Sequence, residues 1–291
     1  MQANLNGVNL YFDIEGPGLV VDGPTVRERP VVFLLHGGPA LDHSTLKPWF
    51  TPLSQVAQLV YLDHRGTGRS SDADPSTYRL AQLADDIEAL RQHLGLGRIV
   101  VLGHSYGGFI ALTYALRHPD SLSQLLLVGT SPSHRFWERS QEMLATAGTP
   151  EQIALGPTLL NGEVATDEQY LHWWATMLSL YFVKPDPQVI AQTVSRVRGN
   201  VKTAQEMLRH DLPAYDVEPL LGSIAVPTFV ATGSHDWIQP SEQSEILVGA
   251  IPGAELFVYK ESGHFPHVEE AERFNGDISD FVRRHWGQGT S

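Results

Sequence analysis

The chain contains no cysteine in its 291 residues. It therefore has neither a disulfide framework nor a thiolate metal site, which fits the reducing environment of the cytoplasm. It also lacks an apolar run of the roughly 18 residues that a membrane-spanning helix needs. Its opening residues, Met-Gln-Ala-Asn-Leu, do not form a basic segment followed by an apolar one. We expect a cytoplasmic protein with no membrane segment.

Positive charge is scarce, with 20 Lys and Arg residues against 33 Asp and Glu residues and a formal net charge of −13. An acidic surface repels nucleic-acid phosphates and anionic lipids, so we expect a small-molecule ligand and no nucleic-acid or membrane partner. A content of 42% hydrophobic and 18% charged residues is typical of one large globular unit with a modest insertion. These figures leave the oligomeric state open.

A serine lies between two glycines where a strand pattern gives way to a helix pattern. Residues 103–107 read Gly-His-Ser-Tyr-Gly and follow the apolar run 99–102. At so tight a turn, a Cβ two residues before or after the serine would collide with its neighbours, and the serine backbone is strained. This arrangement is the nucleophile elbow, which predicts Ser105 as a nucleophile.

Two further polar residues follow apolar runs nearer the end of the chain. Asp236 comes after the run 227–231, and His264 comes after the run 255–259. A serine hydroxyl needs a base beside it and a third group to orient that base. Because parallel strands place their carboxyl ends at one edge of the sheet, we predict that Ser105, His264 and Asp236 meet there as a catalytic triad.

The loop after the first buried parallel strand is rich in glycine. The apolar run 30–35 ends in His-Gly-Gly-Pro at residues 36–39. In acyl transfer the negatively charged oxygen of the intermediate needs fixed donors, usually the N–H after the nucleophile and another from this loop. We predict an oxyanion hole made by the N–H groups of Gly38 and Tyr106.

Strands and helices alternate along most of the chain, which predicts an α/β fold with a mostly parallel sheet. Apolar residues recur at helical spacing through residues 79–93 and predict a helix there. Another helix is predicted over 109–117 and a strand over 123–129. Residues 5–14 are expected to open an antiparallel hairpin, with the partner strand near 19–21 or just beyond.

The alternation stops between residues 131 and 214, which read as helices and loops. We expect this block to form a helical cap over a core of residues 1–130 and 215–291. The cap is rich in aromatic residues. Trp173 and Trp174 of the cap, together with Trp237 beside Asp236, are predicted to line an apolar substrate pocket above Ser105.

Three other segments have structural interpretations. Residues 63–70 are glycine-rich but lack the lysine and spacing of a phosphate-binding loop, so Asp63 and Arg65 are expected to be paired or bonded to backbone. Residues 264–270 do not have metalloprotease spacing, and either Glu269 or Glu270 is expected to cap a helix over 271–285. No metal or cofactor is predicted. Residues 287–291 are expected to be a frayed tail.

Taken together, these motifs resemble the α/β-hydrolase superfamily, whose triad has the chain order Ser, Asp, His. Within it the chain resembles the proline iminopeptidase branch and related esterases. The segments that carry the resemblance are 36–39, 63–70 and 103–108, with Asp236 and His264 after them. The resemblance implies a mostly parallel eight-stranded sheet flanked by helices, with a helical cap inserted after the sixth strand.

The chain departs from the iminopeptidase pattern at two positions. Ala40 stands where those enzymes usually have another glycine, and Trp237 follows Asp236 where a carboxylate would hold the substrate amine. Glu206 lies near the expected place of a cap carboxylate.

The sequence thus predicts a serine hydrolase that cleaves a small or medium ester, including lactones, through an acyl-enzyme. Three alternatives remain open. The first is a proline iminopeptidase-type aminopeptidase, and the second is a carbon–carbon bond hydrolase. The third is a noncatalytic small-molecule-binding protein on the same scaffold.

Overall fold

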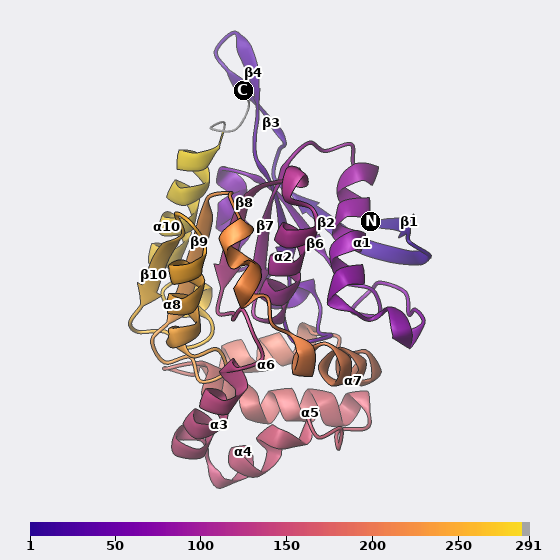
Figure 1. The fold of residues 1–291 in the computed structure, drawn as a ribbon, viewed down its shortest axis with the longest axis vertical. Helices are drawn as coiled ribbons and strands as arrows, with labels where there is room; N and C mark the ends of the chain where they lie inside the picture. The colour runs from indigo at the N-terminus through magenta and orange to yellow at the C-terminus, as the bar shows by residue number, and fades with distance from the viewer. Residues whose placement is uncertain (287–291) are drawn as a thin grey trace.

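A computed structural model describes residues 1–286 and contains an eight-stranded sheet with the strand order β1-β2-β6-β5-β7-β8-β9-β10 (Figure 1). β1 and β2 pair antiparallel with each other, and β2 pairs antiparallel with β6. The other neighbours are parallel. The strands are β1 (Gln2–Leu5), β2 (Val8–Glu15), β5 (Val31–Leu35), β6 (Gln58–Leu62), β7 (Ile99–His104), β8 (Leu122–Val128), β9 (Thr228–Gly233) and β10 (Glu255–Tyr259).

Helices cover both faces of the sheet because its central strands are apolar on both sides. One face packs against α1 (Leu80–His93), α2 (Tyr106–Arg117) and α8 (Ser241–Ala250). The opposite face packs against α10 (Ala271–His285), the short turns η1 (His43–Thr45) and η2 (Thr51–Gln55), and the segment joining them. The short helix α9 (Pro266–Glu269) precedes α10, and the remaining turns of the core are η3 (Pro75–Thr77), η4 (Pro119–Ser121) and η8 (Glu218–Ser223).

The α/β class and the parallel sheet predicted from sequence are confirmed. The helix predicted over 79–93 is α1, which buries Leu83, Ala84, Ile87 and Leu90 at helical spacing. The predicted strand over 123–129 is β8. Within residues 1–286, no helix is long and apolar enough to cross a bilayer.

The predicted pairing of the first hairpin is wrong. β2 turns back on β1, through Asn6 and Gly7, and its other neighbour is β6. Both turn residues have positive φ, the geometry of a tight hairpin turn that Asn-Gly favours. Residues 19–21 belong instead to β3 (Leu19–Asp22), which pairs only with β4 (Thr25–Glu28). This two-stranded ribbon projects from the body of the molecule (Figure 1).

The prediction that Glu269 or Glu270 caps α10 is also wrong, although the bounds of α10 match the expected helix. Glu270 is the N-cap residue, yet its side chain makes no capping hydrogen bond. Its carboxylate accepts the backbone N–H of Glu261 at 3.0 Å. Glu269 accepts the N–H groups of Val183 and Gly263 at 2.8 and 2.7 Å. Both carboxylates therefore bond backbone N–H groups outside α10 and do not cap it. Glu261 and Gly263 belong to the loop before α9, and Val183 belongs to the segment before α6 (Pro187–Arg196).

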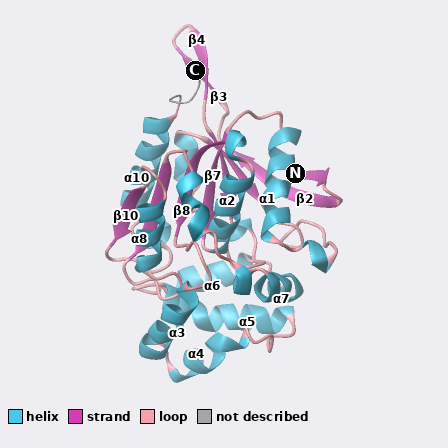
Figure 2. Ribbon diagram, in the orientation of Figure 1, coloured by secondary structure: helices cyan, strands magenta, loops and turns pink. Residues whose placement is uncertain are grey.

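The segment between β8 and β9 is built of helices and loops beyond the carboxyl ends of the parallel strands (Figure 2). We call residues 131–214 the helical insertion. β8 is the sixth strand of the main sheet along the chain, as predicted. The insertion contains α3 (Phe136–Ala147), α4 (Pro150–Leu155), η5 (Gly156–Thr158), α5 (Asp167–Met177), η6 (Leu178–Tyr181), α6 (Pro187–Arg196), α7 (Val201–His210) and η7 (Leu212–Ala214).

Hydrogen bonds tie the insertion to the loops at the edge of the sheet. The hydroxyl of Tyr170 in α5 donates to the carbonyl oxygen of Pro39. The N–H of Asn200 donates to the carbonyl of Ala40 at 3.1 Å. The hydroxyl of Tyr106 donates to Asp211 at 3.3 Å. The insertion is thus anchored beside both loops that were predicted to form the oxyanion hole.

Candidate active site

Ser105 occupies the tight turn between β7 and α2. Its φ of 57° and ψ of −124° place it in a strained region for a residue with a side chain. A Cβ on Gly103 would lie 2.2 Å from the carbonyl oxygen of Gly107, and one on Gly107 would lie 2.1 Å from that of Leu35. Only glycine fits at both positions, which is the steric reason the sequence suggested. α2 begins at Tyr106, three residues before the predicted 109, so Ser105 sits directly at its N-terminus.

Asp236 and His264 form a buried pair at the ends of β9 and β10. His264 Nδ1 lies 2.7 Å from Asp236 Oδ2. The other carboxylate oxygen accepts the backbone N–H groups of Ile238 and Gln239 at 3.0 and 2.9 Å. The carboxylate is therefore fixed on both sides. With Nδ1 bound to it, the imidazole has only Nε2 left to exchange a proton with a substrate or with the serine.

The backbone of His264 is held from two directions. Its N–H donates to the carbonyl of Tyr181 at 2.8 Å, and its own carbonyl lies 3.1 Å from Nε2 of His104. Burial, together with the neighbouring rings of His264 and His267, lowers the pKa of His104 well below its usual range. His104 is therefore neutral and can donate this hydrogen bond across the physiological pH range.

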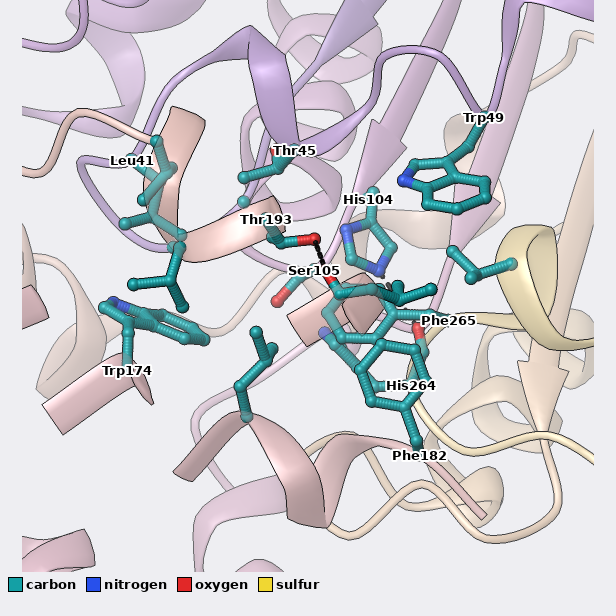
Figure 3. Close-up of a pocket in the computed structure, with 17 residues that line it drawn as sticks. Leu41, Thr45, Trp49, His104, Ser105, Trp174, Phe182, Thr193, His264 and Phe265 are labelled. Carbon is teal, nitrogen blue, oxygen red and sulfur yellow. Dashed lines mark hydrogen bonds between the residues drawn. The ribbon is translucent and has the colours of Figure 1, made fainter. Parts of the chain in front are cut away.

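Ser105 and His264 line the same cavity, which has a volume of about 50 Å³ (Figure 3). We call it the His264 cavity. Apolar side chains from α5, α6, the segment between these helices and the loop after His264 form most of its wall, among them Trp174, Val194, Phe182 and Phe265. The structure thus brings the predicted serine and histidine to one cavity, and the aspartate is hydrogen-bonded behind the histidine.

Gly38 and Tyr106, the predicted oxyanion donors, line one cavity together with Ser105. Gly38 has a φ of +131°, and a Cβ on its neighbour Gly37 would lie 2.7 Å from the Cβ of Ser105. The glycine loop therefore touches the serine. Tyr106 is the first residue of α2, so its N–H stands at the positive end of the helix dipole.

A second cavity of about 70 Å³ is also lined by Ser105, together with Gly38 and Tyr106. We call it the Tyr106 cavity. Trp173 and Trp237 line it, and Trp174 lines both cavities. The three tryptophans predicted from the sequence therefore all line cavities beside Ser105. Their role in substrate binding stays a prediction.

Other polar residues singled out in the sequence have structural partners away from the cavities. Arg65 pairs with Asp86 at 2.6 Å, and Asp63 pairs with His43 at 2.7 Å. These buried pairs hold the loop after β6 in place. Glu206, the candidate cap carboxylate, bonds Arg209 at 3.2 Å and lines neither cavity.

Sequence reasoning missed two side chains that position the site. The sequence pattern assigns no role to His104, although its place next to the serine indicates that its ring could reach the loop of His264. Glu269 bonds the backbone of Gly263 and of Val183. The residues adjacent to Glu269 in the sequence do not indicate either contact. The contact of Glu269 with Val183, like that of His104, joins segments far apart in the chain.

The family model described as alpha/beta hydrolase fold matches residues 30–271. The chain belongs to this family. Proline iminopeptidase PfmaB from Pestalotiopsis fici is 29% identical over 91% of this α/β hydrolase and 93% of the relative. The solved structure of Est816, an N-acyl homoserine lactone degrading enzyme, is 25% identical with a TM-score of 0.74, covering 97% of this chain and 100% of that one.

A third similar protein shows the fold alone. The esterase EaEST from Exiguobacterium antarcticum has a TM-score of 0.75 at 23% identity, covering 97% of this α/β hydrolase and 98% of that chain. The family explains the strand order, the elbow and the helical insertion of the present chain.

Neither cavity has an acidic lining residue within the described part of the chain, residues 1–286. The same residues contain no group of three His, Asp or Glu side chains arranged to hold a metal ion. The lining is almost wholly apolar and aromatic. Among residues 1–286, neither cavity therefore offers a carboxylate to a cationic substrate group.

Proposed function

We propose that this α/β hydrolase is a carboxylic ester hydrolase that cleaves small or medium esters, including lactones. The observation that carries the proposal is the buried Asp236–His264 pair, joined at 2.7 Å, beside the cavity that His264 shares with Ser105. A carboxylate, an imidazole and a serine in this order are the machinery of acyl transfer.

The proposed reaction has two halves. As Ser105 Oγ attacks the ester carbonyl, its proton moves to His264 Nε2, and the carbonyl π electrons move to the oxygen. The N–H groups of Gly38 and Tyr106 stabilise that oxyanion. When the intermediate collapses, the carbon–oxygen bond to the alcohol breaks and His264 returns the proton to the departing oxygen. Water then attacks the acyl-enzyme by the same route and releases the acid.

Asp236 supports both halves without taking the proton. Its carboxylate holds the proton on Nδ1 of His264, so that Nε2 is free to act as base, and it stabilises the imidazolium that forms. The backbone N–H groups of Ile238 and Gln239 bond its other oxygen and so fix the direction of the carboxylate.

A proline iminopeptidase is the second candidate, favoured by the 29% identity to a relative of that name. That reaction requires a partner for the free amine of the substrate. Trp237 is buried beside Asp236 and cannot form an ion pair, and Glu206 is paired with Arg209 outside both cavities. The uncharged lining therefore supports the ester hydrolase over the aminopeptidase.

A substrate panel tests the proposal. The purified protein is assayed with p-nitrophenyl esters, acyl-homoserine lactones and proline-β-naphthylamide, and we expect turnover of the first or second class with at most trace activity on the third. Turnover of the proline substrate alone would reverse the assignment. A carbon–carbon bond hydrolase would turn over none of them yet still react with a fluorophosphonate at Ser105, and a noncatalytic binding protein would not be labelled.

A further inference from the structure

The two cavities beside Ser105 differ in their relation to the catalytic base. The His264 cavity is lined by the imidazole itself. The Tyr106 cavity is lined by Ser105 and by both proposed oxyanion donors, and His264 is not among its lining residues in the described chain. Because His264 must protonate the departing oxygen, the leaving group belongs in the His264 cavity. The acyl group then occupies the Tyr106 cavity.

A larger surface cleft of about 430 Å³ adjoins the Tyr106 cavity. The cleft and the cavity have a common wall, formed by Trp137, Leu159, Leu160, Leu208 and Leu212. The wall side chains come from α3, the segment after η5, the end of α7 and the start of η7. Every member is apolar, so the boundary between cavity and surface contains no polar barrier to a hydrocarbon chain.

Beyond the shared wall the cleft has polar lining residues, of which Asn161 and Arg209 are exposed. Asn161, Gln205, Arg209 and His134 line it, and these residues do not line the cavity at Ser105. An apolar passage that ends at exposed polar residues suits a chain whose body is hydrocarbon and whose far end reaches water. The His264 cavity shares no lining residue with this cleft among residues 1–286, so the passage belongs to the acyl side alone.

We propose that the Tyr106 cavity and the surface cleft form one acyl-binding passage, with Leu208 in the wall that the two share, and that this enzyme accepts esters of medium-chain acids. The inference rests on the ester hydrolase function proposed above. The leaving group is held separately by the His264 cavity, where Val194 lies. Acyl-chain preference and alcohol preference are consequently set by different residues of the insertion.

The test compares Leu208→Trp with a matched control, Leu220→Trp. Leu220 is 55% exposed and lines neither cavity nor the cleft. For each protein, kcat/KM is measured with p-nitrophenyl acetate and p-nitrophenyl octanoate. We expect the octanoate-to-acetate ratio to fall at least tenfold in Leu208→Trp, because the indole closes the passage, and to match the wild-type ratio in Leu220→Trp.

A second variant separates the two sides of the site. Val194→Trp narrows the His264 cavity, so it is expected to lower the ratio of octyl acetate to methyl acetate turnover while leaving the octanoate-to-acetate ratio of the nitrophenyl esters within about threefold of wild type. If Leu208→Trp lowers the alcohol ratio instead of the acyl ratio, or lowers neither, the assigned passage is wrong.

Binding of the product acid gives a readout that does not depend on turnover. Calorimetric titration with sodium octanoate is expected to show binding to the wild type at least tenfold tighter than to Leu208→Trp. An inactive wild type that shows this difference would overturn the ester hydrolase function and support the passage. An active enzyme in which neither the acyl ratio nor octanoate binding responds to Leu208→Trp would overturn the passage alone.

Discussion

The edge of the sheet and the helical insertion meet at Ser105, yet they contribute different kinds of side chain. The strand-end loops supply polar groups fixed by short hydrogen bonds, such as Asp236 against His264 at 2.7 Å. The insertion supplies Trp173, Trp174 and Leu208, which are apolar and line the cavities. We infer that reaction chemistry depends on the sheet edge and that substrate choice depends on the insertion.

The reason for this division lies in how each part is supported. The loop of Asp236 follows a strand that is buried along its whole length, so the carboxylate has a rigid base. The insertion packs on the sheet through apolar side chains of a shared core, and single hydrogen bonds such as that from Tyr170 to Pro39 join it to the edge. Changes at the edge should therefore alter kcat by orders of magnitude, and changes in the insertion should alter it less.

The largest expected effect is that of Ser105→Ala. Removing the hydroxyl leaves no atom to form the acyl-enzyme, so kcat should fall by something on the order of 10⁴ to 10⁶. Steady-state turnover of p-nitrophenyl butyrate measures the loss, and circular dichroism verifies that the variant is folded. Retention of wild-type turnover would refute the role of Ser105 as nucleophile.

Asp236→Asn should cost about 10⁴-fold in kcat, because an amide cannot hold the Nδ1 proton or stabilise the imidazolium. The asparagine keeps its oxygen for the N–H groups of Ile238 and Gln239, so geometry is largely preserved. The matched control is Asp120→Asn, an exposed aspartate in η4. If kcat fell no further in Asp236→Asn than in Asp120→Asn, Asp236 would have no role in the reaction.

Tyr170→Phe tests the insertion side of the comparison. The change removes the hydroxyl that donates to Pro39 and leaves a buried carbonyl without that partner. We expect the free energy of unfolding to fall by about 1 to 3 kcal/mol, with a loss of kcat far smaller than that of Asp236→Asn. Urea unfolding and steady-state kinetics measure the two effects. If kcat fell as far as in Asp236→Asn, the insertion would belong to the chemical machinery and the division would fail.

The sequence was most informative where a residue's own neighbours impose the structure. Apolar runs predicted the parallel strands, and the steric demands around Ser105 predicted the elbow. The turn at Asn6 and Gly7 is equally local, but residues 5–14 were expected to form one arm of a hairpin whose partner lies near 19–21 or just beyond. A strand pattern alone does not show where a tight turn divides it.

Contacts between distant segments were not predictable in the same way. Glu269 bonds Gly263 and Val183, the second of which lies 86 residues away. A carboxylate just before a helix is typical of a helix cap. In the folded protein, Glu269 bonds the N–H groups of Val183 and Gly263, which no local pattern predicts. The passage behind Leu208 likewise depends on how α3, α7 and the segment after η5 pack, since no single segment contains it.

The smallest expected effect concerns stability rather than turnover and lies beneath the sheet edge. His267 is fully buried, packs on Phe50 with ring centroids 4.8 Å apart, and has no hydrogen-bond partner on either ring nitrogen within residues 1–286. Burial, with a smaller contribution from His264, lowers the pKa of His267 to about 3. In the unfolded chain the pKa of histidine is about 6.5.

Between these two values the unfolded chain binds a proton at His267 and the folded chain does not, so lowering the pH favours unfolding. The destabilisation starts near pH 6.5 and grows as the pH falls, reaching something on the order of 2 kcal/mol at pH 5. His267→Phe removes this proton and keeps an aromatic ring in place. We therefore expect the variant to lose less unfolding free energy than the wild type between pH 7.5 and pH 5.

Urea unfolding at both pH values measures the difference, and each protein is compared with itself, so a constant packing penalty of the phenyl ring cancels. Identical losses in the two proteins would mean that His267 is protonated in the folded state near its ordinary pKa. In that event water would reach the ring of His267 beneath His104 and His264. The sheet edge would then lack the rigid, dry support that we infer for the catalytic side chains.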